Sequence, residues 1–239
     1  MGRAHEVRKA SMAKTAAAKT KVYSRFGKEI YMAAKAGTPD PEMNQGLKRK
    51  IEQAKANQVP SDVIKRAIDK AKGGSNESYE ECRYEGFGPG ASTIVIDCLT
   101  DNTNRSISDV KTCFNKAKCK VGVSGSVSHA YDTFGLFMFK YNDDETMLDH
   151  LIMADVDVKD IEVLEDMMTV YVEPNDFHKT QVAIEELIAN VEFELCEIKL
   201  IPGEYVKIEN PEDKELWNRL ITLLEQVDDV KQIYHNVEE

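Results

Sequence analysis

The sequence lacks the cysteine spacing of metal sites and disulfide frameworks, since none of its five cysteines forms a C-x-x-C pair and no histidine lies beside one. Long apolar runs are also missing, because none approaches the roughly 18 residues that a membrane span needs. The basic segment 1–21 has no apolar stretch of the kind that marks a secretory signal. We therefore expect a cytoplasmic protein with no membrane contact, metal, cofactor or small-molecule substrate.

Motifs of catalysis are equally scarce. The glycines of 85–90 lead into an expected strand, whereas a phosphate-binding loop follows a strand and opens a helix, so we interpret them as a turn or a binding loop and not as a nucleotide site. The acidic clusters at 143–145, 155–162 and 165–166 lack the calcium-loop spacing with its central glycine and final glutamate. No Ser-His-Asp or Cys-His set stands out. We expect no enzymatic activity, and an enzyme that uses an acidic cleft is the least favoured hypothesis.

What the sequence does have is a strong separation of charge. Residues 1–75 carry 17 Lys or Arg and 7 Asp or Glu, a net charge of +10. Residues 76–239 carry 14 and 35, a net charge of −21, so the overall −11 is an average over two unlike parts. Such asymmetry is typical of proteins that contact nucleic acid or another anionic surface. Screening over about 8 Å lets a basic face act locally beside an acidic body.

The basic part has the periodicity of three short helices. Residues 10–36 place apolar side chains at helical spacing and a row of lysines and arginines on another face. A turn at 37–41 ends this helix, and a second helix runs to about Asn57. Pro60–Asp62 caps a third helix, which ends at Gly73–Gly74. We predict a light three-helix bundle whose cations occupy the faces that the apolar stripes leave open.

The acidic part alternates between strand and helix periodicity. From 136 to 200 the expected order is strand, helix, two strands, helix and strand, which is the ferredoxin-like unit. Further strands are expected at 93–99, 126–131, 205–208 and 230–235. We therefore predict an α+β protein with a basic helical domain at 1–75, a discontinuous ferredoxin-like α+β domain at 80–132 plus 204–239, and a second ferredoxin-like α+β domain inserted at 133–203.

Clustered cations opposite an acidic body favour a polyanionic partner, although a run of lysines on a helix can also be only a solvated face. Each lysine or arginine that meets a phosphate releases counterions, so binding is expected to depend steeply on salt and little on base sequence. Residues 1–15 are typical of an arm that orders on binding. The predicted nucleic-acid contacts are Arg3, Arg8, Lys9, Lys14, Lys19, Lys21, Arg25, Lys28, Lys35, Lys48, Arg49, Lys55, Lys65 and Arg66.

A second possible contact lies in the acidic part. Arg105 follows the Asp101–Asn104 segment, whose composition is that of a helix cap, and is a cation in acidic surroundings. Gly122, Gly125 and Ser126 have the composition of a mobile loop or of a β-bulge before a strand. We predict that these four residues form the second contact.

Several of these segments resemble the YebC/PmpR family, which includes the mitochondrial translational activators of cytochrome oxidase, and the opening Met-Gly-Arg is similar to its bacterial branch. The matching segments are KVYSRFGKEI at 21–30, AAKAGTPDP at 33–41, RAIDKAKGG at 66–74, RYEGFGP at 83–89, DNTNR at 101–105, GSV at 125–127 and IYHNV at 233–237. They span nearly the whole chain in order. The resemblance implies a basic helical domain and two α+β domains, the middle one closed by the C-terminal segment.

The resemblance leaves two functions open. Members of the family are described as DNA-binding transcriptional regulators, and others act in translation at the ribosome, including relief of stalling at proline-rich stretches. We therefore predict a nucleic-acid-binding regulatory protein. The first hypothesis is a DNA-binding transcriptional regulator, and the alternative is a translation factor that docks on ribosomal RNA. Both polymers present phosphates, so the basic helices fit either.

Overall fold

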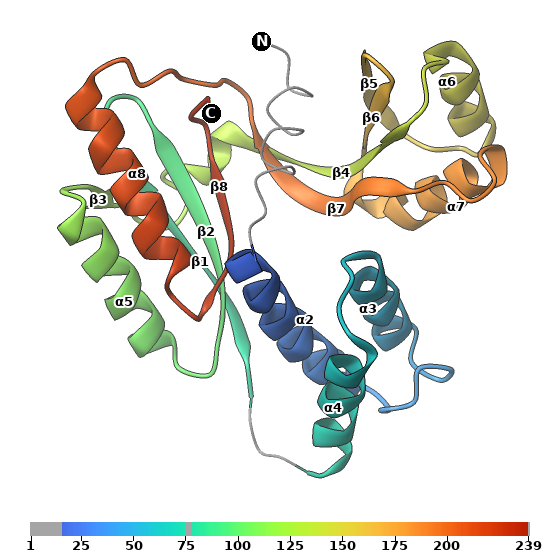
Figure 1. Ribbon diagram of the computed structural model, residues 1–239, viewed down its shortest axis with the longest axis horizontal. Helices are drawn as coiled ribbons and strands as arrows, with labels where there is room; N and C mark the ends of the chain where they lie inside the picture. Colours follow the sequence, from blue (N-terminus) through green and yellow to red (C-terminus); the bar gives the residue numbers. More distant parts are fainter. Residues whose placement is uncertain (1–15, 75–77, 239) are drawn as a thin grey trace. The chain divides into compact units, whose positions relative to one another are not determined.

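The computed structural model describes residues 16–74 and 78–238 (Figure 1). The chain divides into two compact units, one formed by Thr15–His129 with Val206–Val237 and the other containing Ala130–Tyr205. The first unit holds the basic helices and one sheet, and the second holds the other sheet. The predicted insertion at 133–203 lies inside the second unit, whereas the division into three domains remains a prediction.

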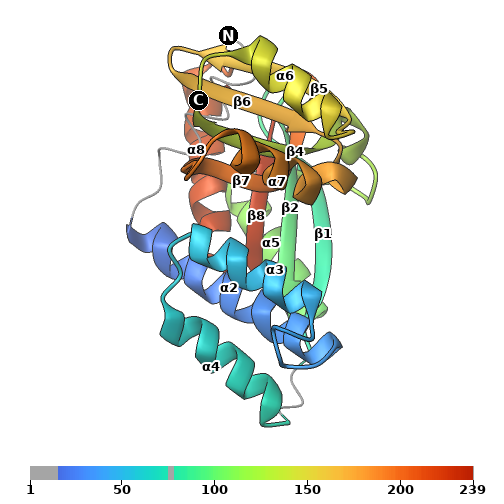
Figure 2. The same cartoon turned by 90° about the vertical axis from the view of Figure 1, so that its right-hand side faces the viewer.

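Three helices form the basic part, and Figure 2 shows α3 and α4 lying along α2. Their bounds are α2 Ala16–Ala36, α3 Gln45–Ala56 and α4 Ser61–Lys72. Their core contains Phe26, Ile30 and Leu47, all buried. The Asn44 side chain caps α3 by accepting from the Leu47 N–H (3.0 Å), and its amide donates to the Ala33 and Thr38 carbonyls. One asparagine therefore fixes the turn between the first two helices.

The first sheet is antiparallel with the strand order β3-β1-β2-β8. Its strands are β1 Glu80–Phe87, β2 Thr93–Thr100, β3 Lys120–Val121 and β8 Val230–His235. The helices α5 Thr103–Lys116 and α8 Pro211–Glu225 cover one of its faces (Figure 1). Segments more than 100 residues apart in the sequence thus share one sheet, because β8 pairs with β2 from Ile94↔His235 to Cys98↔Val230.

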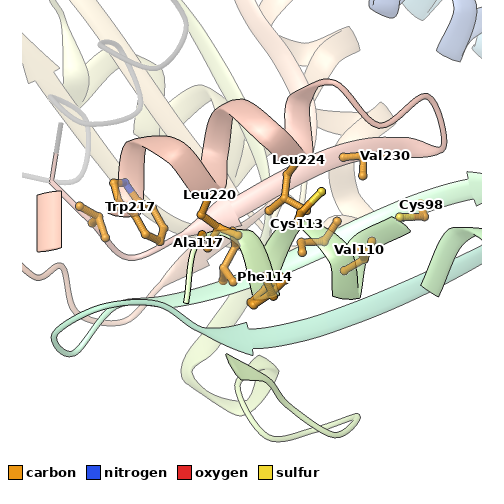
Figure 3. Close-up of a cluster of buried hydrophobic side chains, with 12 residues drawn as sticks. Cys98, Val110, Cys113, Phe114, Ala117, Trp217, Leu220, Leu224 and Val230 are labelled. Carbon is orange, nitrogen blue, oxygen red and sulfur yellow. The ribbon is translucent and has the colours of Figure 1, made fainter. Parts of the chain in front are cut away.

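The core of this sheet lies between the strands and the two helices. Figure 3 shows Trp217, Leu220 and Leu224 of α8 facing Val110, Cys113, Phe114 and Ala117 of α5. Phe114 and Leu220 have no exposed surface. A fully buried aliphatic or aromatic side chain contributes about 1.5–3 kcal/mol through the hydrophobic effect. The C-terminal α8 and β8 are therefore integral to a core that begins at residue 80.

The second sheet has the strand order β5-β6-β4-β7, also antiparallel. Its elements are β4 Tyr131–Lys140, α6 Asp144–Met153, β5 Val158–Leu164, β6 Met167–Val172, α7 Phe177–Leu187 and β7 Phe193–Pro202. This chain order with β4 and β6 central is the ferredoxin-like arrangement expected from the sequence. The helices α6 and α7 cover one face, above a core that includes Phe137, Phe139 and Val170.

The predicted α+β class is confirmed: seven α-helices and two four-stranded antiparallel sheets make up the described residues. The elements of the first sheet follow the order strand, strand, helix, strand, helix, strand, so the ferredoxin-like order predicted for this sheet is not the one observed. Individual strand predictions need correction. The expected turn at 85–90 begins only after Phe87, because β1 pairs with β2 through Phe87↔Thr93. Residues 126–131 contain a short 3-10 helix, Ser128–Ala130, and 205–208 contributes only the isolated bridge Val206↔Val237.

Gly86 supplies a direct test of this packing. A Cβ at Gly86 would lie 2.3 Å from Cε1 of Phe114 and 3.0 Å from the Lys120 carbonyl oxygen. We expect Gly86→Ala to lower the free energy of unfolding by about 1–3 kcal/mol, measured by urea titration with circular dichroism. Gly46→Ala is the control, since its Cβ meets nothing closer than 3.5 Å and alanine favours a helix. Equal stability of both variants would contradict the Gly86–Phe114 contact.

Candidate nucleic-acid interface

Three predicted phosphate contacts on α2 are engaged with the first sheet or with the end of α8, the helix that covers it, instead of facing solvent. Lys21 donates to the Glu225 carbonyl (2.9 Å), and Arg25 donates to the Gln232 side chain (3.1 Å). Lys28 donates to the Leu99 carbonyl (3.2 Å). Burial lowers the pKa of the Lys21 ammonium, with Glu225 acting in the opposite direction. These cations therefore dock α2, which the lysine periodicity alone did not indicate.

Asp229 is the centre of one charge cluster at this junction. Its carboxylate is only 5% exposed and accepts from the Arg105 guanidinium at 2.9 Å and from Thr100 Oγ1 at 2.8 Å. The Lys28 ammonium lies 3.7 Å away. Arg105 also pairs with Asp101 at 2.7 Å, and its pKa is raised by its bonds to Asp229 and Asp101. These ion pairs explain why an arginine occurs in the acidic part. The role predicted for Arg105 in a second nucleic-acid contact is therefore not needed to explain its presence, and it stays a prediction.

Glu29 is the centre of a second cluster, on α2 itself. It is 7% exposed and pairs with Lys50 of α3 (3.0 Å) and Lys231 of β8 (3.2 Å). Lys231 also pairs with Glu81 of β1 at 2.9 Å. Burial acts to raise the pKa of Glu29, but Lys50 and Lys231 outweigh it and leave the pKa below its ordinary value. The carboxylate therefore stays ionised and ties α2 to both α3 and the sheet.

The remaining predicted cations on α3 and α4 point into solvent. Lys48, Arg49 and Lys55 on α3 and Lys65 on α4 are exposed, and none forms an ion pair or hydrogen bond with the side chains that the structure describes. Arg66 is also exposed and pairs with Asp62 one turn earlier. Lys35 lies 5.6 Å from the centre of the Tyr31 ring. Unpaired exposed cations can exchange their counterions for phosphates without breaking any contact of the fold.

The other predicted contacts of the basic part are Lys19 and four residues nearer the N-terminus. Arg3, Arg8, Lys9 and Lys14 lie outside the described residues, and Lys19 is described only as part of α2. Their contribution to binding stays a prediction from the sequence.

The predicted loop at Gly122, Gly125 and Ser126 is held by a buried carboxylate. Glu85, 3% exposed on β1, accepts from the backbone N–H groups of Gly125 (2.7 Å), Val127 (2.6 Å) and Ser128 (2.8 Å). Burial acts to raise the pKa of Glu85, but these amide bonds outweigh it and lower the pKa. Converging amides form an anion site, and here the protein's own carboxylate fills it. The conformation of the loop is therefore held by a side chain of the protein itself, Glu85.

The described residues have few features of a metal site, a membrane span or a small-molecule pocket. They contain no group of three or more His, Cys, Asp or Glu side chains that could hold a metal ion. None of the helices between 16 and 238 is both long and apolar enough to cross a membrane. A shallow pocket on β1 and β2 is lined by charged groups already paired with each other, namely Arg83 with Asp97 and Lys231 with Glu81.

The Glu29 cluster predicts a pH-dependent contribution to stability. We expect Glu29→Gln to lower the free energy of unfolding by about 2 kcal/mol at pH 7, because it removes the buried carboxylate that Lys50 and Lys231 share. The folded pKa lies below the ordinary value of 4.5, so this contribution is complete above pH 4.5 and is lost as pH falls through the folded pKa. The gap between wild type and variant in urea titrations should therefore close in acid. The exposed Glu52→Gln is the control, and a gap that grew in acid would contradict the assignment.

The Glu85 bonds predict how firmly the loop is held. We expect Glu85→Gln to speed backbone amide exchange at Gly125, Val127 and Ser128 by about tenfold or more, because an amide retains only one accepting oxygen. Hydrogen exchange followed by NMR measures this at each residue. Glu80→Gln, at the exposed start of the same strand, should leave the three rates unchanged. Unaltered exchange in the Glu85 variant would mean that the loop orders by other contacts.

Comparison with known proteins places this arrangement in a family. Residues 3–74 match the TACO1/YebC protein N-terminal domain, and residues 79–237 match the TACO1/YebC second and third domain. A probable transcriptional regulatory protein of Acholeplasma laidlawii is 56% identical over 237 residues, which cover 99% of this chain and 98% of that protein. One from Vibrio parahaemolyticus is 50% identical over 238 residues and the full length of both. The crystal structure of a conserved hypothetical protein from Aquifex aeolicus is similar with a TM-score of 0.77 and 32% identity, over 95% of this chain and 93% of that one. The chain therefore belongs to the TACO1/YebC family.

Proposed function

We propose that this protein is a regulatory protein that binds nucleic acid through the exposed cations of α3 and α4. The observation that carries the proposal is the group formed by Lys48, Arg49, Lys55 and Lys65, which are exposed and unpaired within the described residues of an otherwise acidic chain. The names of relatives at about 50% identity favour transcriptional regulation, and hence DNA, as the setting.

Physical chemistry supports a sequence-tolerant contact. Lysine and arginine side chains on a helix surface meet phosphates as flexible charges, which position a protein on a nucleic acid without reading bases. The rest of the chain repels a polyanion, because residues 76–239 carry a net charge of −21. This repulsion orients the basic helices toward the nucleic acid and disfavours other modes of binding. Any preference between DNA sequences would then come from shape or from a partner protein.

Ribosomal RNA is the second candidate partner. It is favoured by the same exposed cations, which match the phosphates of an RNA helix as well as those of DNA. The predicted loop contact at Gly122, Gly125 and Ser126 belongs with this candidate, since Glu85 holds the loop in a defined shape while Val123 at its tip is 76% exposed.

Charge reversal tests the proposed interface. We expect the combined Lys48→Glu, Arg49→Glu, Lys55→Glu and Lys65→Glu variant to bind a DNA duplex or an RNA hairpin at least about tenfold more weakly, measured by fluorescence anisotropy at several salt concentrations. The slope of log affinity against log salt should become shallower by about 3–4, because up to four phosphate contacts are lost. Native circular dichroism is expected, since these side chains hold no contact of the described fold.

The control carries the same change of charge on the acidic part. Lys111→Glu, Lys116→Glu, Lys207→Glu and Lys214→Glu replace four exposed lysines of the first unit, and binding should fall far less. Equal loss of affinity in the two variants would mean that net charge, rather than the exposed cations of α3 and α4, governs binding.

Sedimentation of a lysate on a sucrose gradient distinguishes ribosomal RNA from DNA as the partner. Salt-sensitive migration with ribosomes that the α3–α4 variant loses would replace the DNA assignment by the RNA one.

A further inference from the structure

Residues 130–205, which lie in the second unit, carry most of the net negative charge of the acidic part 76–239. Residues 130–205 contain four lysines, no arginine and 19 Asp or Glu, a net charge of −15. A surface of this sign repels nucleic acid, so the unit takes no part in the contact proposed for α3 and α4. A charge of this size instead attracts cationic partners and accelerates their association.

One helix of this unit combines negative charge with exposed apolar side chains. Leu148 and Ile152 lie one turn apart on α6 and are 39% and 58% exposed, and Met153 beside them is 87% exposed. The inner face of the same helix is occupied by Met147 and Leu151, which are fully buried. Single exposed apolar residues are common on soluble proteins, but a contiguous group is typical of an interaction site.

Two carboxylates lie on the same outward face of α6. Glu145 precedes Leu148 by three residues and Asp149 precedes Ile152 by three, which makes the members of each pair neighbours on the helix surface. Both are exposed, and neither pairs with a cation among the described residues. In contrast, the acids near the start of α7 are neutralised, since Asp176 pairs with Lys179 at 3.1 Å. The outward face of α6 thus offers apolar contact and unsatisfied negative charge together.

We propose that this face, formed by Glu145, Leu148, Asp149, Ile152 and Met153, docks a basic amphipathic segment of a partner protein. An amphipathic helix whose apolar stripe is flanked by Lys or Arg matches it, because its leucines would cover Leu148 and Ile152 while its cations meet the two carboxylates. A second copy of this chain fits less well, since two faces with the same negative charge repel each other across a two-fold interface.

The test uses the full-length protein and a synthetic peptide of about 18 residues in which leucine and lysine repeat at helical spacing. Its affinity is measured by fluorescence anisotropy of the labelled peptide. We expect Leu148→Ser with Ile152→Ser to weaken binding about tenfold or more, since the apolar contact is removed. Glu145→Gln with Asp149→Asn should weaken binding and reduce its dependence on salt. Val182→Ser with Glu186→Gln, an exposed apolar and acidic pair on α7, is the matched control and should stay within about twofold of wild type.

A peptide of the same composition with its leucines and lysines shuffled decides whether the contact is specific. Equal binding of the shuffled peptide, or unchanged binding to the Leu148 and Ile152 variant, would overturn the proposal. Sedimentation of the protein alone covers the other occupant: a dimer that dissociates in that variant would make the face a self-interface and overturn the proposal as well. Nucleic-acid binding should be the same in all α6 variants, so this inference and the proposed function fail independently.

Discussion

The junction between α2 and the first sheet contains two buried carboxylates, one on each side, and each pairs with a lysine from the opposite side. Asp229 belongs to the sheet side and receives Lys28 from α2, whereas Glu29 belongs to α2 and receives Lys231 from β8. Each carboxylate also has a cation on its own side, Arg105 for Asp229 and Lys50 for Glu29, and docking of the helix adds the second cation to each cluster. Losing a partner of a buried charge is destabilising, so both clusters favour the docked position of α2. This exchange fixes where the basic helices sit within the first unit, and hence which of their cations remain outside.

The lysines and arginines of the basic part therefore divide into two groups with different physical behaviour. Lys21, Arg25 and Lys28 are partly buried and hold the fold, and salt screens such contacts only weakly. Lys48, Arg49 and Lys55 are exposed and keep their counterions until a polyanion replaces them. The net charge of residues 1–75 does not distinguish these groups. It counts cations that are paired within the protein together with cations that are available to a partner.

Much of the fold could be predicted from the sequence, because each helix and most strands carry a clear apolar period. The ferredoxin-like order of the second sheet follows from residues 136–200 alone, and β8 begins and ends where the pattern Val230–His235 predicts. The period is absent where one strand is two residues long, as in β3 at Lys120–Val121, or mixed with charge, as in β1. The strand β1 is fixed by pairing with β2, and β3 is fixed by pairing with β1. Strand pairing is a tertiary effect that a local sequence pattern does not contain.

The candidate site was less predictable than the fold for a related reason. A lysine stripe indicates that cations share a helix face, but which face meets another part of the chain depends on distant residues. Glu29 did carry a signal, since it falls beside Ile30 on the apolar side of α2, where an acid is unexpected unless it is paired. Glu85 carried a weaker one, as a lone acid ahead of two glycines. In both cases the partner lies far along the chain, at Lys231 and at Gly125–Ser128, so spacing gave no indication of it.

The position of Glu85 also constrains how the Gly122 loop can act. Converging backbone amides in such a loop would ordinarily attract a phosphate, yet three of them already donate to an ionised carboxylate that is buried and pinned on β1. Displacing that carboxylate would leave a buried charge without its hydrogen-bond donors. The free-energy cost of that loss is larger than the free energy gained from one phosphate contact. Any contact that the loop makes must therefore use its outer surface, where Val123 is exposed, while Glu85 sets its shape. The exposed cations of α3 and α4 differ from this loop, since they could meet a phosphate without breaking any contact of the described fold.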